Sequence, residues 1–298
     1  MDVKQYKYTF TVFTPTYNRA YIINRVFDSL MKQTFKDFEW LIVDDGSSDN
    51  TQEVIEEFKK TAWFPIRYIY KENGGKHTAY NRGIKEANGE LFLVFDSDDS
   101  CIGNALERFY FHWNNIPSDK KDKFFAMGAL CQDQNGKIIG DKFPEDVFDS
   151  DTIESTFKYN IQGEKWGFLT TDIAKQYPFK VFENERFVTE SSVWFEISKK
   201  YKARYINEAL RIYEINDDSL SFDAVKIRRT SPKGTTYSYL QQLTLNIPFV
   251  YKVKAMINCF RFSFYNKHCF FECIKKVNKF MLLPSLFLAF IMYLKDKK

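Results

Sequence analysis

Aspartates gather where apolar segments of this chain end. Asp44-Asp45 follows the apolar segment Trp40–Val43, and Asp96-Ser97-Asp98-Asp99 follows Leu91–Phe95. Carboxylates two residues apart, such as those of Asp96 and Asp98, project to the same side of an extended chain, and their oxygens suit Mg²⁺ or Mn²⁺. Such an ion binds one or two carboxylates together with substrate phosphates. The spacing therefore predicts a site for a divalent cation and a nucleoside diphosphate.

Two further apolar segments run into polar turns in the same way. Phe10–Thr14 leads into Pro15-Thr16-Tyr17-Asn18, and Ile66–Tyr70 leads into Lys71-Glu72-Asn73-Gly74. The four apolar segments follow one another at about one strand-helix unit, the spacing of a parallel sheet, and ligands bind such a sheet at the carboxyl ends of its strands. We therefore predict an α/β fold in which a Rossmann-like parallel sheet, flanked by helices, presents the four turns at one edge.

Two common phosphate-binding patterns are absent from the sequence. A dinucleotide fold carries Gly-x-Gly-x-x-Gly after its first strand, where this chain has Pro15-Thr16-Tyr17-Asn18. A phosphate loop needs a glycine five residues before a Gly-Lys-Ser/Thr triplet, but Tyr70 stands at the glycine position and His77 follows Gly75-Lys76. The sequence therefore favours a nucleotide held by carboxylates and a cation.

Five motifs in register resemble the family-two inverting glycosyltransferases, which share the nucleotide-sugar fold usually called type A. They lie in order over roughly the first hundred residues: Pro15-Thr16-Tyr17-Asn18-Arg19, Gln33-Thr34-Phe35-Lys36-Asp37-Phe38-Glu39, Val43-Asp44-Asp45-Gly46-Ser47-Ser48-Asp49, Asn73-Gly74-Gly75 with Ala79-x-Asn81-x-Gly83, and Phe95-Asp96-Ser97-Asp98-Asp99. Beyond residue 100 the resemblance is carried by a few positions.

The first two turns are expected to form the nucleotide pocket. We place Pro15 and Tyr17 against the base and expect Asp45 to accept its imide N–H, as the equivalent residue does in the family that the chain resembles. Asp44 is then left to reach the ribose. The alternative is that Asp44 or Asp45 only caps the helix after Gly46.

The third and fourth turns are expected to hold the diphosphate and its cation. Asp98 is the predicted metal ligand and Asp99 supports it. Asp96 is expected either to contact the ribose or to hold the metal ligand in place without binding the metal itself. Lys76 is predicted to touch the diphosphate; the alternative is that Lys76 and His77 are ordinary loop residues. The expected cofactor is Mn²⁺ or Mg²⁺.

The resemblance also implies a catalytic base. Related enzymes place an acidic residue, commonly in a Glu-Asp pair, at the start of a helix well after the metal motif. Phe187–Trp194 fits that position, with Glu190 as the candidate and Ser191 in place of the second acid. A glutamate that only stabilises the helix start is the alternative.

These assignments imply transfer of a sugar, with inversion, from a nucleoside-diphosphate donor, most simply a UDP-sugar, to a hydroxyl of a saccharide or lipid-linked acceptor in cell-surface polysaccharide synthesis. Two other classes stay open. A nucleotidyltransferase would open with a glycine-rich basic loop, and residues 9–19 contain no glycine. A non-catalytic sugar-nucleotide binder is favoured only by the missing acid at position 191.

The C-terminal segment differs in charge from the rest of the 298-residue chain. From residue 223 onward it has 14 Lys or Arg and 3 Asp or Glu, whereas the remainder has 29 and 36. Phe280–Leu294 carries no charge across 15 residues, which is short of the roughly 20 that span a bilayer. We expect a helical basic tail at the membrane surface, where anionic lipid attracts each lysine by roughly 1 kcal/mol. Packing on the catalytic domain or on a second subunit of a homodimer is the alternative, and nucleic acid is not an expected partner.

Composition and motif placement set the expected organisation. We predict a catalytic domain over residues 1–222, with a nucleotide half to residue 100 and an acceptor half after it, and a tail over 223–298. Met1–Lys7 lacks the apolar core of a secretion signal, so we expect a cytoplasmic enzyme at the inner face of the cell membrane. The five cysteines are expected to be reduced. Phe124–Cys131 and the turn Asn135-Gly136 are expected to form an antiparallel hairpin at the sheet edge.

Overall fold

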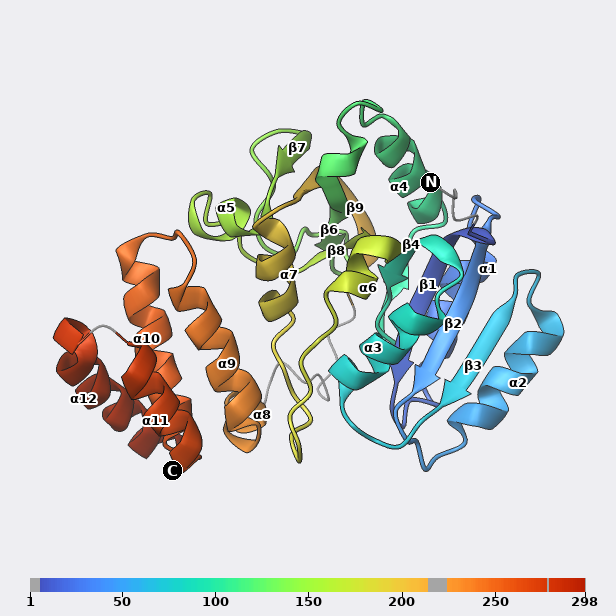
Figure 1. Ribbon diagram of the computed structural model, residues 1–298. Coiled ribbons are helices and arrows are strands. Elements are labelled where there is room, and N and C mark those ends of the chain that lie inside the picture. Colours follow the sequence, from blue (N-terminus) through green and yellow to red (C-terminus); the bar gives the residue numbers. More distant parts are fainter. Residues whose placement is uncertain (1–5, 214–223, 278, 298) are drawn as a thin grey trace. The chain divides into compact units, whose positions relative to one another are not determined.

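A computed structural model describes residues 6–213, 224–277 and 279–297 (Figure 1). Within this range the chain divides into two compact units. The first comprises residues 6–152, 161–178 and 197–213, and the second comprises the remaining described residues. The predicted domain boundary after residue 222 lies outside the described residues and stays a prediction.

The first unit is built on a sheet whose parallel part contains the four strands that the sequence predicts. They are β1 (Tyr8–Thr16), β2 (Phe38–Asp44), β3 (Ile66–Tyr70) and β4 (Gly89–Val94), paired in the order β3-β2-β1-β4. Helices connect them: α1 (Asn24–Met31), α2 (Thr51–Thr61) and α3 (Lys76–Glu86). The order reverses between β1 and β4, which is the switch point where open α/β sheets bind ligands. The predicted fold class is confirmed.

The sheet continues beyond β4 through strands of mixed direction. β8 (Lys165–Thr170) pairs antiparallel with β4 and with β6 (Phe124–Gln132), and β6 pairs parallel with β9 (Lys202–Ile212). The short strands β5 (Ser100–Cys101) and β7 (Val147–Ser150) pair antiparallel with β9.

Two expectations for this half of the sheet are wrong. Phe124–Cys131 is not in an edge hairpin, because β6 lies between β8 and β9; beyond the turn, a single bridge joins Gln132 to Ile138. The sequence also predicts two separate strands, over 203–206 and 210–215; residues 214 and 215 lie outside the described residues, and the described part is one strand, β9, with register shifts opposite β6.

Alternating side chains of the parallel strands face two helical layers, because successive residues of a strand point to opposite faces. Phe10 and Val12 join the core formed with α1, α2 and α4 (Ala105–Asn114). Phe13 instead packs on α3, where its ring stacks on Phe92 and meets Tyr80 edge to face. A Cβ at Gly83 of α3 would lie 2.4 Å from that ring, so glycine is required there. α6 (Thr171–Gln176) follows β8, and the other short elements are η1 (Lys121–Lys123) and α5 (Thr152–Phe157).

The second unit is helical, as expected for the tail. Its helices are α8 (Ala224–Thr230), α9 (Pro232–Leu243), α10 (Phe249–Ser263), α11 (Lys267–Lys276) and α12 (Lys279–Asp296), together with the start of α7 (Ser191–Ser198) and all of α5 but its first residue. Met256, Phe260 and Ala289 form a core of their own. The expectation of five reduced cysteines is wrong, because a disulfide joins Cys259 of α10 to Cys273 of α11.

Candidate functional site

The four polar turns meet at the carboxyl edge of the parallel strands, as the sequence predicts. Strand register places Thr16 opposite Asp44 and Asp44 opposite Tyr70, while Phe13 pairs with Val94 just before the last turn. A hydrogen bond also connects the first and second turns, because the Asn18 N–H donates to Ser47 Oγ at 2.8 Å. The edge therefore carries side chains from all four turns on one rigid frame.

Tyr17 and Pro15 lie at the end of β1. The Tyr17 ring is 49% exposed, whereas Pro15 is partly covered. An exposed aromatic ring at this edge offers a flat surface to a nucleotide base. Contact of Pro15 and Tyr17 with a base stays a prediction.

Asp44 is fully buried, and both of its carboxylate oxygens accept hydrogen bonds. Oδ1 accepts from the Ser47 N–H and Oδ2 from the Tyr68 hydroxyl, each at 2.7 Å. Burial, together with this contact to Asp44, raises the pKa of Tyr68. Asp44 thus fixes the turn at Ser47, four residues before α2 begins, and does not cap that helix, whose N-cap residue is Asn50. Its predicted contact with a ribose stays a prediction.

Asp45 holds the next turn along the sheet. Its Oδ1 accepts from Lys71 Nζ at 2.5 Å and from the Gly74 N–H at 3.0 Å, and its Oδ2 accepts from the Gly75 N–H at 2.7 Å. Gly75 has φ of 93° and directly precedes α3, so the carboxylate fixes the backbone at the start of that helix. Asp45 therefore positions Lys76, and its predicted contact with a base would use the remaining acceptor capacity of Oδ2.

The aspartate turn 96–99 is surrounded by the chain's own cations. Lys76 Nζ lies 2.8 Å from Asp96 Oδ1, and Arg211 Nη2 lies 3.4 Å from Asp96 Oδ2. Arg211 Nη2 also contacts Asp99 directly. Burial alone would raise the pKa of Asp96, but the charges of Lys76 and Arg211 outweigh it and lower that pKa to about 2. Asp96 is therefore a carboxylate at neutral pH.

Asp98 and Asp99 differ in how firmly they are held. The Asp98 side chain is 24% exposed and its nearest cation is Arg19, with Nη2 4.0 Å from Oδ2, while its main-chain oxygen accepts from Arg25 Nη1 at 3.2 Å. The Asp99 side chain is 2% exposed and lies against Arg211. Asp98 is thus the more accessible of the two predicted metal residues.

A divalent cation fits the donor set of this turn. Asp96 and Asp98 offer partly exposed carboxylate oxygens, the ligand type that Mg²⁺ and Mn²⁺ prefer. Nowhere in the described part of the chain do three His, Cys, Asp or Glu side chains converge to hold a metal. Phosphate oxygens and water would complete the coordination, as is usual where Mg²⁺ binds with a nucleotide.

The family comparison agrees with this arrangement. Residues 11–119, which include all four turns, match the model of glycosyl transferase family 2. This segment is a glycosyl transferase family 2 domain. The match ends before β9, so Arg211 lies outside it.

Curated relatives of the family 2 chain are glycosyltransferases. One from Campylobacter jejuni, GalNAc(5)-diNAcBac-PP-undecaprenol beta-1,3-glucosyltransferase, is 28% identical over 227 residues, covering 72% of this chain and 68% of that protein. Glycosyltransferase GlyA of Streptococcus pneumoniae is 29% identical over 221 residues, 71% of this chain. An uncharacterized glycosyltransferase of Rickettsia bellii is 32% identical over 243 residues, 78% of this chain. The chain spans only 31% and 34% of the last two proteins.

Solved structures share the fold. S. aureus TarS 1-349 in complex with UDP-GlcNAc superposes with a TM-score of 0.66 at 18% identity, over 97% of this chain and 89% of that one. The mannosyltransferase PcManGT from Pyrobaculum calidifontis, in complex with GDP-Man and Mn²⁺, gives 0.58 at 15% identity, over 99% and 89%. At these identities the likeness establishes the fold of the family 2 chain.

Glu190 belongs to the second unit, whereas the other predicted site residues belong to the first. It directly precedes α7, and its main-chain oxygen accepts from the Val193 and Trp194 N–H groups. Glu185, which lies in the same segment, is buried and accepts from the Lys233 and Gly234 N–H groups, both at 2.8 Å, at the start of α9. Glu185 is thus occupied as a cap, and Glu190 stays the predicted base.

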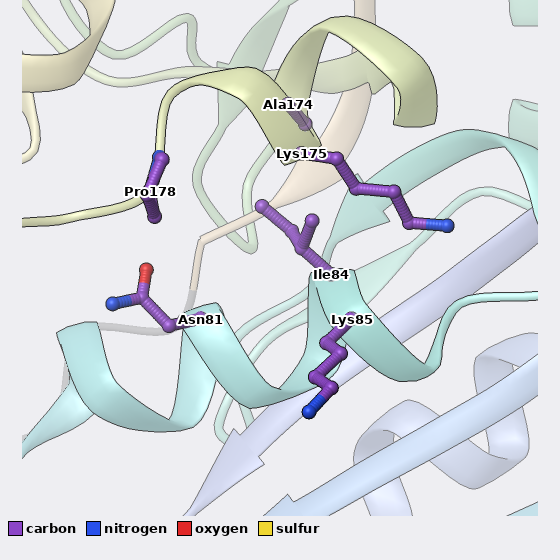
Figure 2. A pocket seen from close by; sticks show the side chains of 6 residues that line it. All are labelled: Asn81, Ile84, Lys85, Ala174, Lys175 and Pro178. Carbon is purple, nitrogen blue, oxygen red and sulfur yellow. The ribbon is translucent and has the colours of Figure 1, made fainter.

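Figure 2 shows a cavity of about 380 Å³ in the first unit. It is formed along α3 and the segment around α6, and its lining residues are Asn81, Ile84, Lys85, Ala174, Lys175 and Pro178. None of them is a predicted site residue, so this cavity is not part of the predicted site.

Sequence reasoning missed several residues of the site. Lys71 and Arg19 stood inside the quoted turns, and their positive charge was the available signal. Arg211 gave no signal, because it lies 112 residues after Asp99 in the sequence and only the pairing of β9 with β5 brings the two together.

Proposed function

We propose that the chain transfers a sugar, with inversion, from a nucleoside-diphosphate donor, most simply a UDP-sugar, to a hydroxyl of a saccharide or lipid-linked acceptor. The observation that carries the proposal is the aspartate turn 96–99 within a family 2 domain, at the switch point of a parallel sheet. TarS was solved with UDP-GlcNAc, and the Campylobacter relative is named for a lipid-linked saccharide acceptor. A role in cell-surface polysaccharide synthesis follows from such an acceptor.

On the donor side, the chain supplies positive charge and fixed carboxylates. Lys76, at the first turn of α3, pairs with Asp96 and is 41% exposed, so its ammonium can turn to a phosphate oxygen at little cost. The N–H groups that open α3 also favour negative charge there. We assign Mn²⁺ or Mg²⁺ to Asp98 and Asp96, with Asp99 in support; when bound, it stabilises the charge that develops on the departing diphosphate.

On the acceptor side, we propose Glu190 as the base that removes the hydroxyl proton. Glu190 directly precedes α7, the position at which the family-two enzymes that the chain resembles place an acidic residue, and a carboxylate within hydrogen-bond reach of the acceptor hydroxyl can take its proton. Displacement by that hydroxyl from the side opposite the diphosphate inverts the sugar carbon.

The donor is tested by thermal shift. The protein would be screened against UDP- and GDP-sugars with Mn²⁺ and with EDTA. We expect UDP-sugars to raise the melting temperature with Mn²⁺ only. If no nucleotide sugar raises the melting temperature, the donor assignment is wrong.

We propose further that α12 holds the enzyme at the inner face of the cell membrane. Leu283, Phe287, Phe290 and Leu294 recur at helical spacing and are 77%, 67%, 48% and 48% exposed, while Ala289 is buried. We call these four residues the α12 stripe. No helix in the described part of the chain has both the length and the apolar composition for a membrane crossing. The stripe therefore suits the bilayer surface.

The positive charge of the C-terminal segment favours anionic lipid as the partner of the α12 stripe. The segment from residue 223 has 14 basic and 3 acidic residues, and two of the acidic ones are compensated. Asp296 pairs with Arg261, and Glu272 lies 3.7 Å from Lys275 and 3.6 Å from Lys276. The excess of exposed lysine favours an anionic surface.

Vesicle co-sedimentation tests this association. We expect binding to phosphatidylglycerol vesicles but not to phosphatidylcholine, and loss of binding in Leu283→Ser/Phe287→Ser. Val181→Ser, which alters an apolar residue 56% exposed outside these helices, should bind like the wild type. If light scattering instead shows that the double variant dissociates a dimer and lipid binding is absent, a second copy covers the stripe.

A further inference from the structure

Strand pairing places Arg211 next to the aspartate turn 96–99. It lies near the end of β9, where its backbone pairs with Cys101 of β5, two residues after Asp99. Its side chain is 7% exposed, so the guanidinium is fixed in the interior next to the turn. A buried arginine held in this way needs carboxylate partners, because an unpaired buried charge is costly.

The guanidinium of Arg211 is shared by two of the three aspartates. Nη2 contacts Asp99 directly and lies 3.4 Å from Asp96 Oδ2. The other oxygen of Asp96 faces Lys76 at 2.8 Å. Within the described residues, the cation that pairs with the Asp98 carboxylate is Arg19, whose Nη2 is 4.0 Å away. Arg211 thus holds Asp96 and Asp99 at the two ends of the turn, and the Asp98 carboxylate between them is held least firmly.

We propose that Arg211 is a positioning residue of the donor site, and the inference rests on the function proposed above. By holding Asp99 and one oxygen of Asp96, it sets the turn so that the Asp98 carboxylate faces the incoming cation and diphosphate. Residues that orient metal ligands in this way typically change metal affinity by about 10–100-fold when they are removed.

A matched pair of variants separates positioning from general stability. Arg204 lies on the same strand, is also buried, and forms a two-bond ion pair with Asp149, 2.8 Å for each bond, away from the aspartate turn. Arg211→Met and Arg204→Met should both lower the melting temperature, because each leaves a carboxylate without its partner. Only Arg211→Met should weaken Mn²⁺ binding.

The experiment titrates Mn²⁺ into the full chain with UDP and follows free Mn²⁺ by electron paramagnetic resonance. We expect Arg211→Met to weaken Mn²⁺ binding about 10–100-fold. Arg211→Lys should give a smaller loss, since lysine keeps the charge but lacks the planar fork. Unchanged or tighter Mn²⁺ binding in Arg211→Met would overturn the proposal, because Arg211 would then be only a counter-ion that competes with the cation.

A second variant covers the case in which Arg211→Met does not fold. Asp99→Asn/Arg211→Met removes the buried pair without leaving a charge behind. It should fold and bind Mn²⁺ more weakly than Asp99→Asn alone, because Asp96 has lost its contact with Arg211; an affinity equal to that of Asp99→Asn would overturn the proposal. If the wild-type chain binds no Mn²⁺ with UDP, the proposed function itself has failed, and the two failures are thus distinguishable.

Discussion

Replacing Asp45 with alanine should loosen the start of α3 as well as the donor site. The carboxylate accepts two backbone N–H groups, those of Gly74 and Gly75, and the ammonium of Lys71. A hydrogen bond to a charged group is worth about 1.5–3 kcal/mol. Lys71 is partly exposed and contributes little after screening. The two backbone bonds alone give a loss of about 3 kcal/mol in the free energy of unfolding.

That loss should appear in thermal unfolding. For a domain of this size, each kcal/mol moves the melting temperature by about 2–4 °C, so we expect Asp45→Ala to melt about 6–12 °C lower. UDP affinity should fall by about 1.5–3 kcal/mol in calorimetry. Asp37→Ala is the control, because Asp37 also accepts two hydrogen bonds, both from Thr9, at the opposite end of the sheet. It should lower the melting temperature without changing UDP affinity.

The opposite pattern would refute this reasoning. If Asp45→Ala melts like the wild type but loses both UDP affinity and the preference for uridine, then Asp45 contacts the base directly and the Gly74–Gly75 turn is held by other groups. If neither property changes, Asp45 has no part in the site.

Three further predictions concern single residues. Asp98→Ala should abolish transfer while the melting temperature stays within about 1 °C, because the side chain is partly exposed and weakly paired; normal activity would exclude Asp98 as a ligand. Glu190→Gln should keep UDP affinity but cut turnover by about 10²–10⁴, the usual contribution of a general base; near-normal turnover would move the base elsewhere. Burial lowers the pKa of His77 below its usual 6.5, and no hydrogen bond to its ring nitrogens is found within the described residues. The unfolded chain then binds the proton more readily, so stability should fall as the pH drops below about 6.5, by at most about 1.4 kcal/mol per pH unit. His77→Gln should flatten this part of the stability curve measured by urea unfolding, and an unchanged slope would contradict the assignment.

The parallel half of the sheet was predictable because each strand is a short apolar run that ends in a polar turn. Phe10–Thr14 and Leu91–Phe95 are buried on both faces, which makes them continuous apolar segments. The motif at Gln33 also has a structural explanation. Gln33 Nε2 donates to the Ile102 carbonyl, and Gln33 Oε1 accepts from the Leu106 N–H, so this side chain connects the end of α1 to the start of α4.

The second half was less predictable because its contacts are distant in sequence. β7 has little apolar pattern to predict it, since Val147 and Asp149 are exposed and only Phe148 is a buried apolar residue among its four. The role of Glu185 as a cap could not be predicted, because the Lys233 and Gly234 N–H groups that occupy its carboxylate come from a helix nearly fifty residues later. Arg211 and the Cys259–Cys273 disulfide are likewise set by packing rather than by local pattern.

The release of UDP from UDP-sugars tests the central claim most directly. The purified chain would be incubated with each UDP-sugar and with Mn²⁺, and free UDP would be measured with and without EDTA, beside Asp98→Ala. We expect at least one UDP-sugar to yield UDP with Mn²⁺, and neither EDTA-treated protein nor Asp98→Ala to do so. Release that is undiminished by EDTA and by Asp98→Ala would contradict a cation held at the aspartate turn, and no release from any UDP-sugar would contradict the proposed donor.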